Sequence, residues 1–218
     1  MKEVNSNKIK GIIFDLDGTL IDSFHAIMEG FNATLPHYGL DPIGIEETKA
    51  LVGKSLADTF GEMLGYEHAD EATTIFRKRY KEVYLEKTTP LPHADETIKK
   101  LSAMGYRIGV ATNKHGAFSR DIIAHLGWGD AVKSVVGDGD IPNTKPDPGM
   151  IYKNLENILL HEKDVVFVGD SLIDMMTGKN ASVRTIGVPT GHHSKQMLLD
   201  SGAELVIDDL SQLEGAIA

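Results

Sequence analysis

The chain has 218 residues, of which 41% are hydrophobic and 25% are charged, as is ordinary for a water-soluble globular protein. Its formal net charge of −10 disfavours nucleic acid and anionic membrane surfaces as partners. Because it contains no cysteine, a disulfide framework, a thiolate zinc site and a cysteine nucleophile are all excluded.

The first ten residues are polar and lack the apolar core of a secretion signal. No later stretch is apolar over the length that a membrane-spanning helix needs. We therefore expect a soluble cytoplasmic protein with no membrane partner, present as a monomer or a homodimer. A chain of this length is near the size at which one domain becomes two.

Residues 11–23 are the most informative part of the sequence. The apolar run 12–14 is short enough for one buried strand and too short for a helix, and it stops at Asp15 and Asp17. Ligands of open α/β sheets bind beyond the carboxyl ends of the strands. Two carboxylates at such a place repel each other unless a proton or a cation separates them, and Mg²⁺ prefers hard oxygen ligands. The acidic pair therefore predicts a magnesium site.

Two other structures are typical of a short acidic stretch. The first is a solvated turn, because Asp-Gly is a common pair in turns. The second is a calcium-binding EF-hand loop, which needs glycine at its sixth position and glutamate at its twelfth. Here Gly18 is the fourth residue counted from Asp15, and no acid occupies the twelfth position, so the calcium loop is excluded.

Residues 22–89 show helical periodicity and no strand pattern. Apolar residues recur at helical spacing, and glycine and proline interrupt them, which predicts an all-helical insert. The expected helices cover about residues 24–35, 45–51, 56–64 and 72–84.

Beyond residue 90, apolar strands alternate with helices, a pattern typical of a parallel sheet with right-handed crossovers. Strand 12–14 must join this sheet because it has no other partner. The sequence thus predicts a doubly wound α/β fold in which residues 1–21 and 90–218 form the core domain. Residues 22–89 are expected to form a helical cap domain over the strand ends. The expected strands are 12–14, 106–111, 134–136, 165–168, 185–188 and 205–207.

Polar residues follow several of these strands or lie in the loops after them. Because the carboxyl ends of parallel strands share one edge of a sheet, residues far apart in the sequence converge there. Acids with a bound cation, a lysine and a hydroxyl are suited to phosphoryl transfer, in which a carboxylate attacks phosphorus and the positive groups neutralise its oxygens. The candidate residues are Asp15, Asp17, Thr112, Asn113, Lys145, Asp170 and Asp174.

Four segments resemble, in order and spacing, the four motifs of the haloacid dehalogenase-like phosphatases. They are Asp-Leu-Asp-Gly-Thr-Leu-Ile-Asp-Ser at 15–23, Ala-Thr-Asn-Lys at 111–114, Thr-Lys-Pro-Asp-Pro at 144–148 and Val-Gly-Asp-Ser-Leu-Ile-Asp-Met at 168–175. The helical insert is similar to the small cap of the phosphoglycolate phosphatase-like subfamily. The resemblance implies a Rossmann-like core with an inserted cap, and Mg²⁺ as the cofactor.

The resemblance also implies a role for each acid. Asp15 is expected to be the nucleophile that takes the phosphoryl group, and Asp17 to protonate the leaving alcohol and then to activate water. Mg²⁺ is expected to bind the Asp15 carboxylate, the Asp17 backbone carbonyl and Asp170. Asp174 is expected to be a further ligand, or a partner that orients a metal-bound water or Lys145.

The remaining motif residues are expected to bind substrate. Thr112, the backbone amide of Asn113 and Lys145 would hold the phosphoryl oxygens. Lys54, in the loop between two cap helices, is a further candidate for substrate contact, although a solvated lysine fits its position equally well. His192 and His193 are adjacent and so lack the helical spacing of metal ligands, and we expect a surface loop there.

The function that the resemblance implies is hydrolysis of a small phosphorylated metabolite such as 2-phosphoglycolate. A pyrophosphatase or nucleotidase of the same subfamily stays open, because the core motifs do not distinguish leaving groups. A phosphomutase similar to β-phosphoglucomutase uses the same motifs. Phosphonoacetaldehyde hydrolysis would need a cap lysine, for which Lys54 is the candidate. Haloacid dehalogenation is disfavoured because it needs neither Asp17 nor a metal, and a non-catalytic binding protein would be expected to lack one of the motif acids or Lys145.

Overall fold

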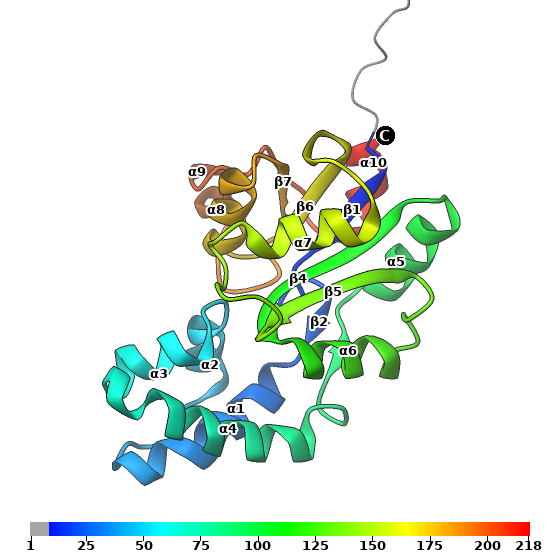
Figure 1. Ribbon diagram of the computed structural model, residues 1–218. Helices are drawn as coiled ribbons and strands as arrows, with labels where there is room; N and C mark the ends of the chain where they lie inside the picture. Colours follow the sequence, from blue (N-terminus) through cyan, green and yellow to red (C-terminus); the bar gives the residue numbers. More distant parts are fainter. Residues whose placement is uncertain (1–8) are drawn as a thin grey trace, which may run out of the picture.

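A six-stranded parallel sheet with the strand order β5-β4-β1-β6-β7-β8 forms the centre of the computed structural model, which describes residues 9–218 (Figure 1). The predicted doubly wound α/β fold is confirmed. The expectation about the N-terminal segment falls largely on residues 1–8, outside the described residues. The strands are β1 (Gly11–Phe14), β4 (Arg107–His115), β5 (Val132–Asp138), β6 (Val165–Gly169), β7 (Arg184–Gly187) and β8 (Leu205–Val206).

The first strand lies in the middle of the sheet and is fully buried. Ile12 and Phe14 pack into one apolar cluster, which contains residues of α5 and α6, and Ile13 packs into another, which contains residues of α7. Side chains of a strand alternate between its two faces, so helices cover both faces of the sheet. The helices of this region are α5 (Ala94–Ala103), α6 (Gly116–His125), α7 (Gly149–Ile158), α8 (Leu172–Asn180), α9 (Lys195–Asp200) and α10 (Leu213–Ile217).

Four helices between β1 and the rest of the sheet form a separate layer, seen at the lower left of Figure 1. We call residues 24–83 the cap segment. Its two longest helices pack closely, because Gly30 has no side chain and Phe76 lies against it; a Cβ at Gly30 would be 2.6 Å from the Phe76 ring. The helices are α1 (Phe24–Thr34), α2 (Ile45–Leu51), α3 (Leu56–Leu64) and α4 (Ala69–Val83).

A short antiparallel ribbon joins the cap segment to the sheet. It pairs β2 (Ile21–Asp22) with β3 (Thr89–Pro90). The expectation of no strand in residues 22–89 is therefore wrong at both ends of that range, since two paired residues are too few to produce a periodic pattern. The division into a core domain and a cap domain stays a prediction.

Two strands are clearly longer than the sequence predicts. β5 (Val132–Asp138) is expected only over residues 134–136, and β4 is extended at its carboxyl end. β4 continues to His115 rather than ending at residue 111, and its pairing with β5 shifts register between Thr112 and His115. The polar run after Ala111 has the composition of a loop, which explains the difference in β4. The short helices α9 and α10 were also not predicted.

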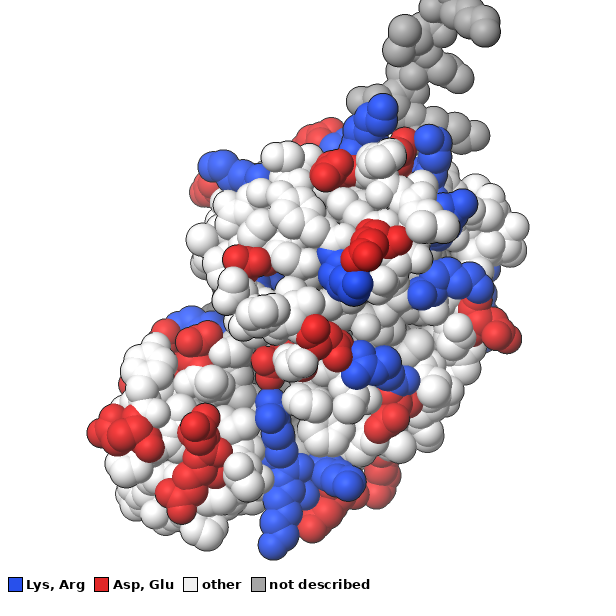
Figure 2. All heavy atoms as spheres, viewed as in Figure 1, with Lys and Arg blue, Asp and Glu red and all other residues white. Residues whose placement is uncertain are grey.

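The surface carries both signs of charge. On the face in Figure 2, Lys and Arg side chains are interspersed with Asp and Glu side chains. No helix within residues 9–218 combines the length and the apolarity needed to cross a membrane.

Candidate active site

The candidate site lies at the carboxyl edge of the sheet, where β1 separates β4 from β6. Asp15 directly follows β1, Thr112 and Asn113 lie near the end of β4, and Asp170 directly follows β6. Lys145 comes from the loop between β5 and α7. In doubly wound sheets the loops diverge at such a point and leave a crevice between them.

Three carboxylates and one ammonium group meet there in the interior of the protein. Asp15, Asp170 and Asp174 each offer a carboxylate oxygen, and these oxygens lie within 4.8 Å of one another. The Lys145 Nζ atom lies 2.6 Å from Asp15 Oδ1 and 2.7 Å from Asp174 Oδ1. One lysine therefore faces three acids.

This imbalance is visible in the proton affinities of the acids. Burial, reinforced by the charge of Asp174, raises the pKa of Asp15 to about 7 even though Lys145 opposes the change. Burial and the charges of Asp174 and Asp15 raise the pKa of Asp170 well above its ordinary value. A divalent cation would remove the repulsion, and a set of carboxylate oxygens is the donor set that hard cations prefer. The residues present thus fit a divalent metal ion.

Hydrogen bonds from neighbouring residues fix the two acids that follow β6. Ser171 donates its backbone N–H (3.0 Å) and its hydroxyl (2.6 Å) to Asp174 Oδ2, which is a capping box at the start of α8. Thr19 donates its hydroxyl to Asp170 Oδ1 at 2.7 Å. Gly18 has a φ of 84°, and a Cβ there would lie 2.6 Å from Asp170 Oδ2, so only glycine fits at this position.

Asn113, in β4, connects two loops to the sheet by hydrogen bonds. Its side-chain oxygen accepts the backbone N–H of Lys145 at 2.8 Å, and its Nδ2 atom donates to the carbonyls of Lys145 (3.1 Å) and Gly53 (2.8 Å). Gly53 belongs to the cap segment, so Asn113 connects that segment to the floor of the site. The Thr112 hydroxyl oxygen accepts the Lys114 N–H at 3.2 Å, which leaves the hydroxyl proton of Thr112 to donate elsewhere.

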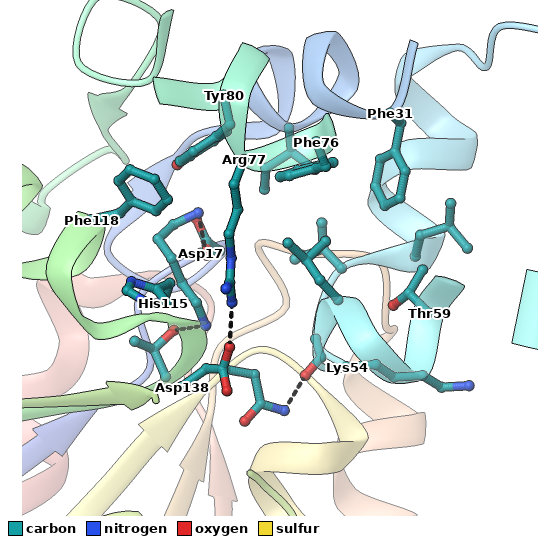
Figure 3. Close-up of a pocket in the computed structure, with 18 of the residues that line it drawn as sticks. Asp17, Phe31, Lys54, Thr59, Phe76, Arg77, Tyr80, His115, Phe118 and Asp138 are labelled. Atoms are coloured by element: carbon teal, nitrogen blue, oxygen red, sulfur yellow. Dashed lines mark hydrogen bonds and ion pairs between the residues drawn. The ribbon is translucent and has the colours of Figure 1, made fainter. Parts of the chain in front are cut away.

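A cavity that is partly open to solvent lies between the acids and the cap segment, and about 680 Å³ of space there, solvent included, is not filled by protein atoms (Figure 3). Asp15, Asp17 and Lys145 line it on the side of the sheet, and aromatic rings of the cap segment line the opposite side. Arg77 of α4 reaches across to Asp138 of β5, with Nη2 2.8 Å from Oδ2. An ion pair thus joins the two layers beside the cavity.

Lys54, His192 and His193 are not members of the carboxylate cluster, although the two histidines line a small cavity together with Asp15, Asp17 and Asp170. The Lys54 ammonium pairs with Glu62, 2.7 Å from Oε1, and its side chain is about half exposed; Figure 3 shows it extending away from Asp17. Substrate contact by Lys54 stays a prediction. His192 is exposed and His193 half-buried in the loop after β7, and among residues 9–218 the carboxylate cluster suited to a metal contains neither of them.

Two basic residues of the cavity were assigned no role from the sequence. Lys114 lies with Nζ 3.0 Å from Asp17 Oδ2. Burial alone would lower the pKa of Lys114, but the charge of Asp17 raises it above its ordinary value, so the lysine is held charged. Lys114 is part of the second motif and its place there was a usable signal. Arg77 is one of several basic residues on an amphipathic helix, and no local pattern distinguishes it.

Comparison with known proteins agrees with this geometry. Residues 12–188 match the model of the haloacid dehalogenase-like hydrolase family. A phosphoglycolate phosphatase of Psychrobacter arcticus is 33% identical, covering 93% of this chain and 93% of the relative. The pyrophosphatase PpaX of Bacillus velezensis is 29% identical, and the alignment covers 96% of this chain and 97% of the relative. The solved structure of a haloacid dehalogenase-like family protein of Streptococcus pneumoniae superposes with a TM-score of 0.86 at 22% identity. The superposition covers 96% of this chain and 99% of that protein.

The fold and the acidic site define a hydrolase with a parallel α/β core. The chain belongs to the family of haloacid dehalogenase-like hydrolases. With the family match, these relatives identify it as an enzyme of the phosphatase class.

Proposed function

We propose that the protein is a Mg²⁺-dependent phosphatase that hydrolyses a small phosphomonoester, of which phosphoglycolate is the leading candidate. The observation that carries the proposal is the buried Lys145 ammonium between Asp15 and Asp174, beside Asp170 and at the inner end of a cavity. A nucleophilic carboxylate, a fixed positive charge and a donor set for a divalent cation are thereby available at one place.

Two steps follow from this arrangement. An Asp15 oxygen forms a bond to phosphorus while the bond to the leaving oxygen breaks, and Asp17 gives that oxygen a proton. Asp17 then takes a proton from water as the water attacks phosphorus and releases Asp15. Lys145, Thr112 and the Asn113 amide hold the phosphoryl oxygens during both steps.

The metal would be held by the carboxylates of Asp15 and Asp170 and the backbone carbonyl of Asp17, with Asp174 beside it as a further ligand or as the partner of Lys145. When bound, Mg²⁺ supplies positive charge that neutralises the transferring phosphoryl group. The chemistry of the donor set supports this assignment, since all the candidate ligands are oxygen atoms.

Residues 22–89 would act as a cap domain over residues 1–21 and 90–218, and would shield the reacting group from bulk water. We further propose a cytoplasmic location and a small phosphorylated metabolite as substrate. The relative named a pyrophosphatase favours inorganic pyrophosphate as a second candidate substrate.

A phosphate-release screen with Mg²⁺ tests the function, with phosphoglycolate, sugar phosphates, nucleotides and pyrophosphate as substrates. We expect phosphoglycolate to give the highest kcat/KM. Isomerisation of glucose 1-phosphate with a bisphosphate primer and without phosphate release would instead identify a phosphomutase. Asp15→Asn serves as the matched variant, and we expect it to lose more than ~10²–10³-fold in turnover. Unchanged turnover in Asp15→Asn would show that Asp15 is not the nucleophile.

A further inference from the structure

Lys114 lies in the irregular part of β4, between the register-shifted residues Thr112 and His115. Irregular pairing of this kind re-aims side chains that a regular strand would direct to alternate faces. The neighbouring strand accommodates it through Gly137, where a Cβ would lie 2.5 Å from the Lys114 carbonyl oxygen. The backbone of Lys114 is therefore closely packed, and its direction is set by the fold.

The side chain of Lys114 ends at the acid predicted to act on the leaving group. Its Nζ atom is 3.0 Å from Asp17 Oδ2, and the two side chains are only 7% and 9% exposed. The other carboxylate oxygen of Asp17, Oδ1, accepts a hydrogen bond from the hydroxyl of Ser23. Both oxygens of Asp17 are thus held, one by a hydroxyl and one by an ammonium group.

The cap segment covers the same lysine. The ring of Tyr80, in α4, has its centroid 4.7 Å from the Lys114 Nζ atom and is itself buried. A cation over an aromatic ring is attracted by it, more strongly when water is excluded. Tyr80 therefore stabilises the position of Lys114 only while α4 lies over the core.

We propose that Lys114 is a positioning residue for Asp17, and that it fixes the carboxyl group in the orientation from which a proton reaches the leaving oxygen. This proposal rests on the proposed function. As the bond from Asp15 to phosphorus forms and the bond from phosphorus to the leaving oxygen breaks, the proton of Asp17 passes to that oxygen. Lys114 and Ser23 then hold the carboxylate that remains.

Proton donation matters in proportion to the basicity of the leaving group, which gives a test. An alkyl phosphomonoester such as phosphoglycolate releases a strongly basic alkoxide, whereas p-nitrophenyl phosphate releases a stable anion that needs no proton. For Lys114→Met we expect kcat/KM to fall about 10²-fold with the alkyl ester and less than about tenfold with the aryl ester. Lys114→Arg, which keeps the charge, should recover part of the loss with the alkyl ester.

Three controls keep the test decisive. Asp17→Asn should show the same dependence on the leaving group, and Lys78→Met, at an exposed position of α4, should show none. Thermal unfolding shows whether Lys114→Met is folded. If Lys114→Met is not folded, the two esters are compared with Lys114→Gln instead, which keeps a hydrogen-bond donor. Equal losses with both esters would overturn the inference and indicate a substrate-binding or structural lysine. Wild-type protein that hydrolyses neither ester would overturn the proposed function itself.

Discussion

Asp15 is an acid whose ionisation the surrounding protein opposes. Its pKa is raised to about 7 from an ordinary value of 3.8, mainly because the side chain is buried and also because of the charge of Asp174. Between these two values the folded chain binds a proton that the unfolded chain has lost. The proton stabilises the fold at low pH, and this stabilisation is lost as the pH rises through about 7.

We therefore expect the metal-free protein to become less stable to heat as the pH rises from about 5.5 to about 8. Thermal unfolding in the presence of a chelator measures this. In Asp15→Asn the titrating group is absent, so the melting temperature should depend less steeply on pH. A wild-type slope equal to that of the variant would show that Asp15 does not titrate in this range.

The two buried lysines of the site, Lys145 and Lys114, pair with three different acids. Lys145 pairs with Asp15 and Asp174, and Lys114 pairs with Asp17. Each ammonium group therefore has a carboxylate partner, which buried charges need. The sequence indicated Lys145 through its motif, whereas the partner of Lys114 depends on a contact between positions almost a hundred residues apart.

At the scale of the elements, α1 and α4 make a close helix–helix contact. Phe76 packs against Phe31 with ring centroids 5.1 Å apart, and it also contacts Phe60 and Tyr80. Because rings surround it on several sides, Phe76 has little room to move away from Gly30. The contact depends on the absence of a side chain at Gly30.

Gly30→Ala should lower the free energy of unfolding by ~1–3 kcal/mol, even though alanine is the better helix former. Urea unfolding at equilibrium measures the change. Gly215→Ala is the matched control, because Gly215 lies in α10 with no atom within 4 Å of an added Cβ. That variant should be neutral or up to about 1 kcal/mol more stable. A Gly30→Ala protein as stable as wild type would mean that α1 and α4 readjust at no cost.

At the scale of the whole molecule, the sheet could be predicted and much of the site's detail could not. Buried parallel strands are continuous apolar runs, and polar residues directly after them mark the carboxyl edge, so local patterns locate Asp15 and Asp170. The ribbon of β2 and β3 depends on pairing between residues 21–22 and 89–90. The motif indicates Lys114 itself, but its pairing with Asp17, like the pairing of Arg77 with Asp138, is formed only in the folded chain. Long-range contacts of this kind leave no local pattern.

A metal ion bound at the carboxylate cluster would also stabilise the folded protein as a whole. A ligand that binds the folded state alone stabilises it by ~2.7 kcal/mol at a concentration one hundred times its dissociation constant. We expect Mg²⁺ to raise the melting temperature of the wild-type protein and to lose this effect in Asp170→Asn. Asp200→Asn, at an exposed position of α9, is the control and should respond as wild type does. An undiminished response in Asp170→Asn would place the metal elsewhere.

The ribbon of β2 and β3 attaches the cap segment to the sheet through residues that lie outside the cap segment itself. The chain departs at Asp22 and returns at Thr89, and these two residues are paired backbone to backbone. Whatever is inserted between them has its two ends already side by side. An insert of another length or shape with its ends at these two residues would therefore leave the path of the sheet unchanged.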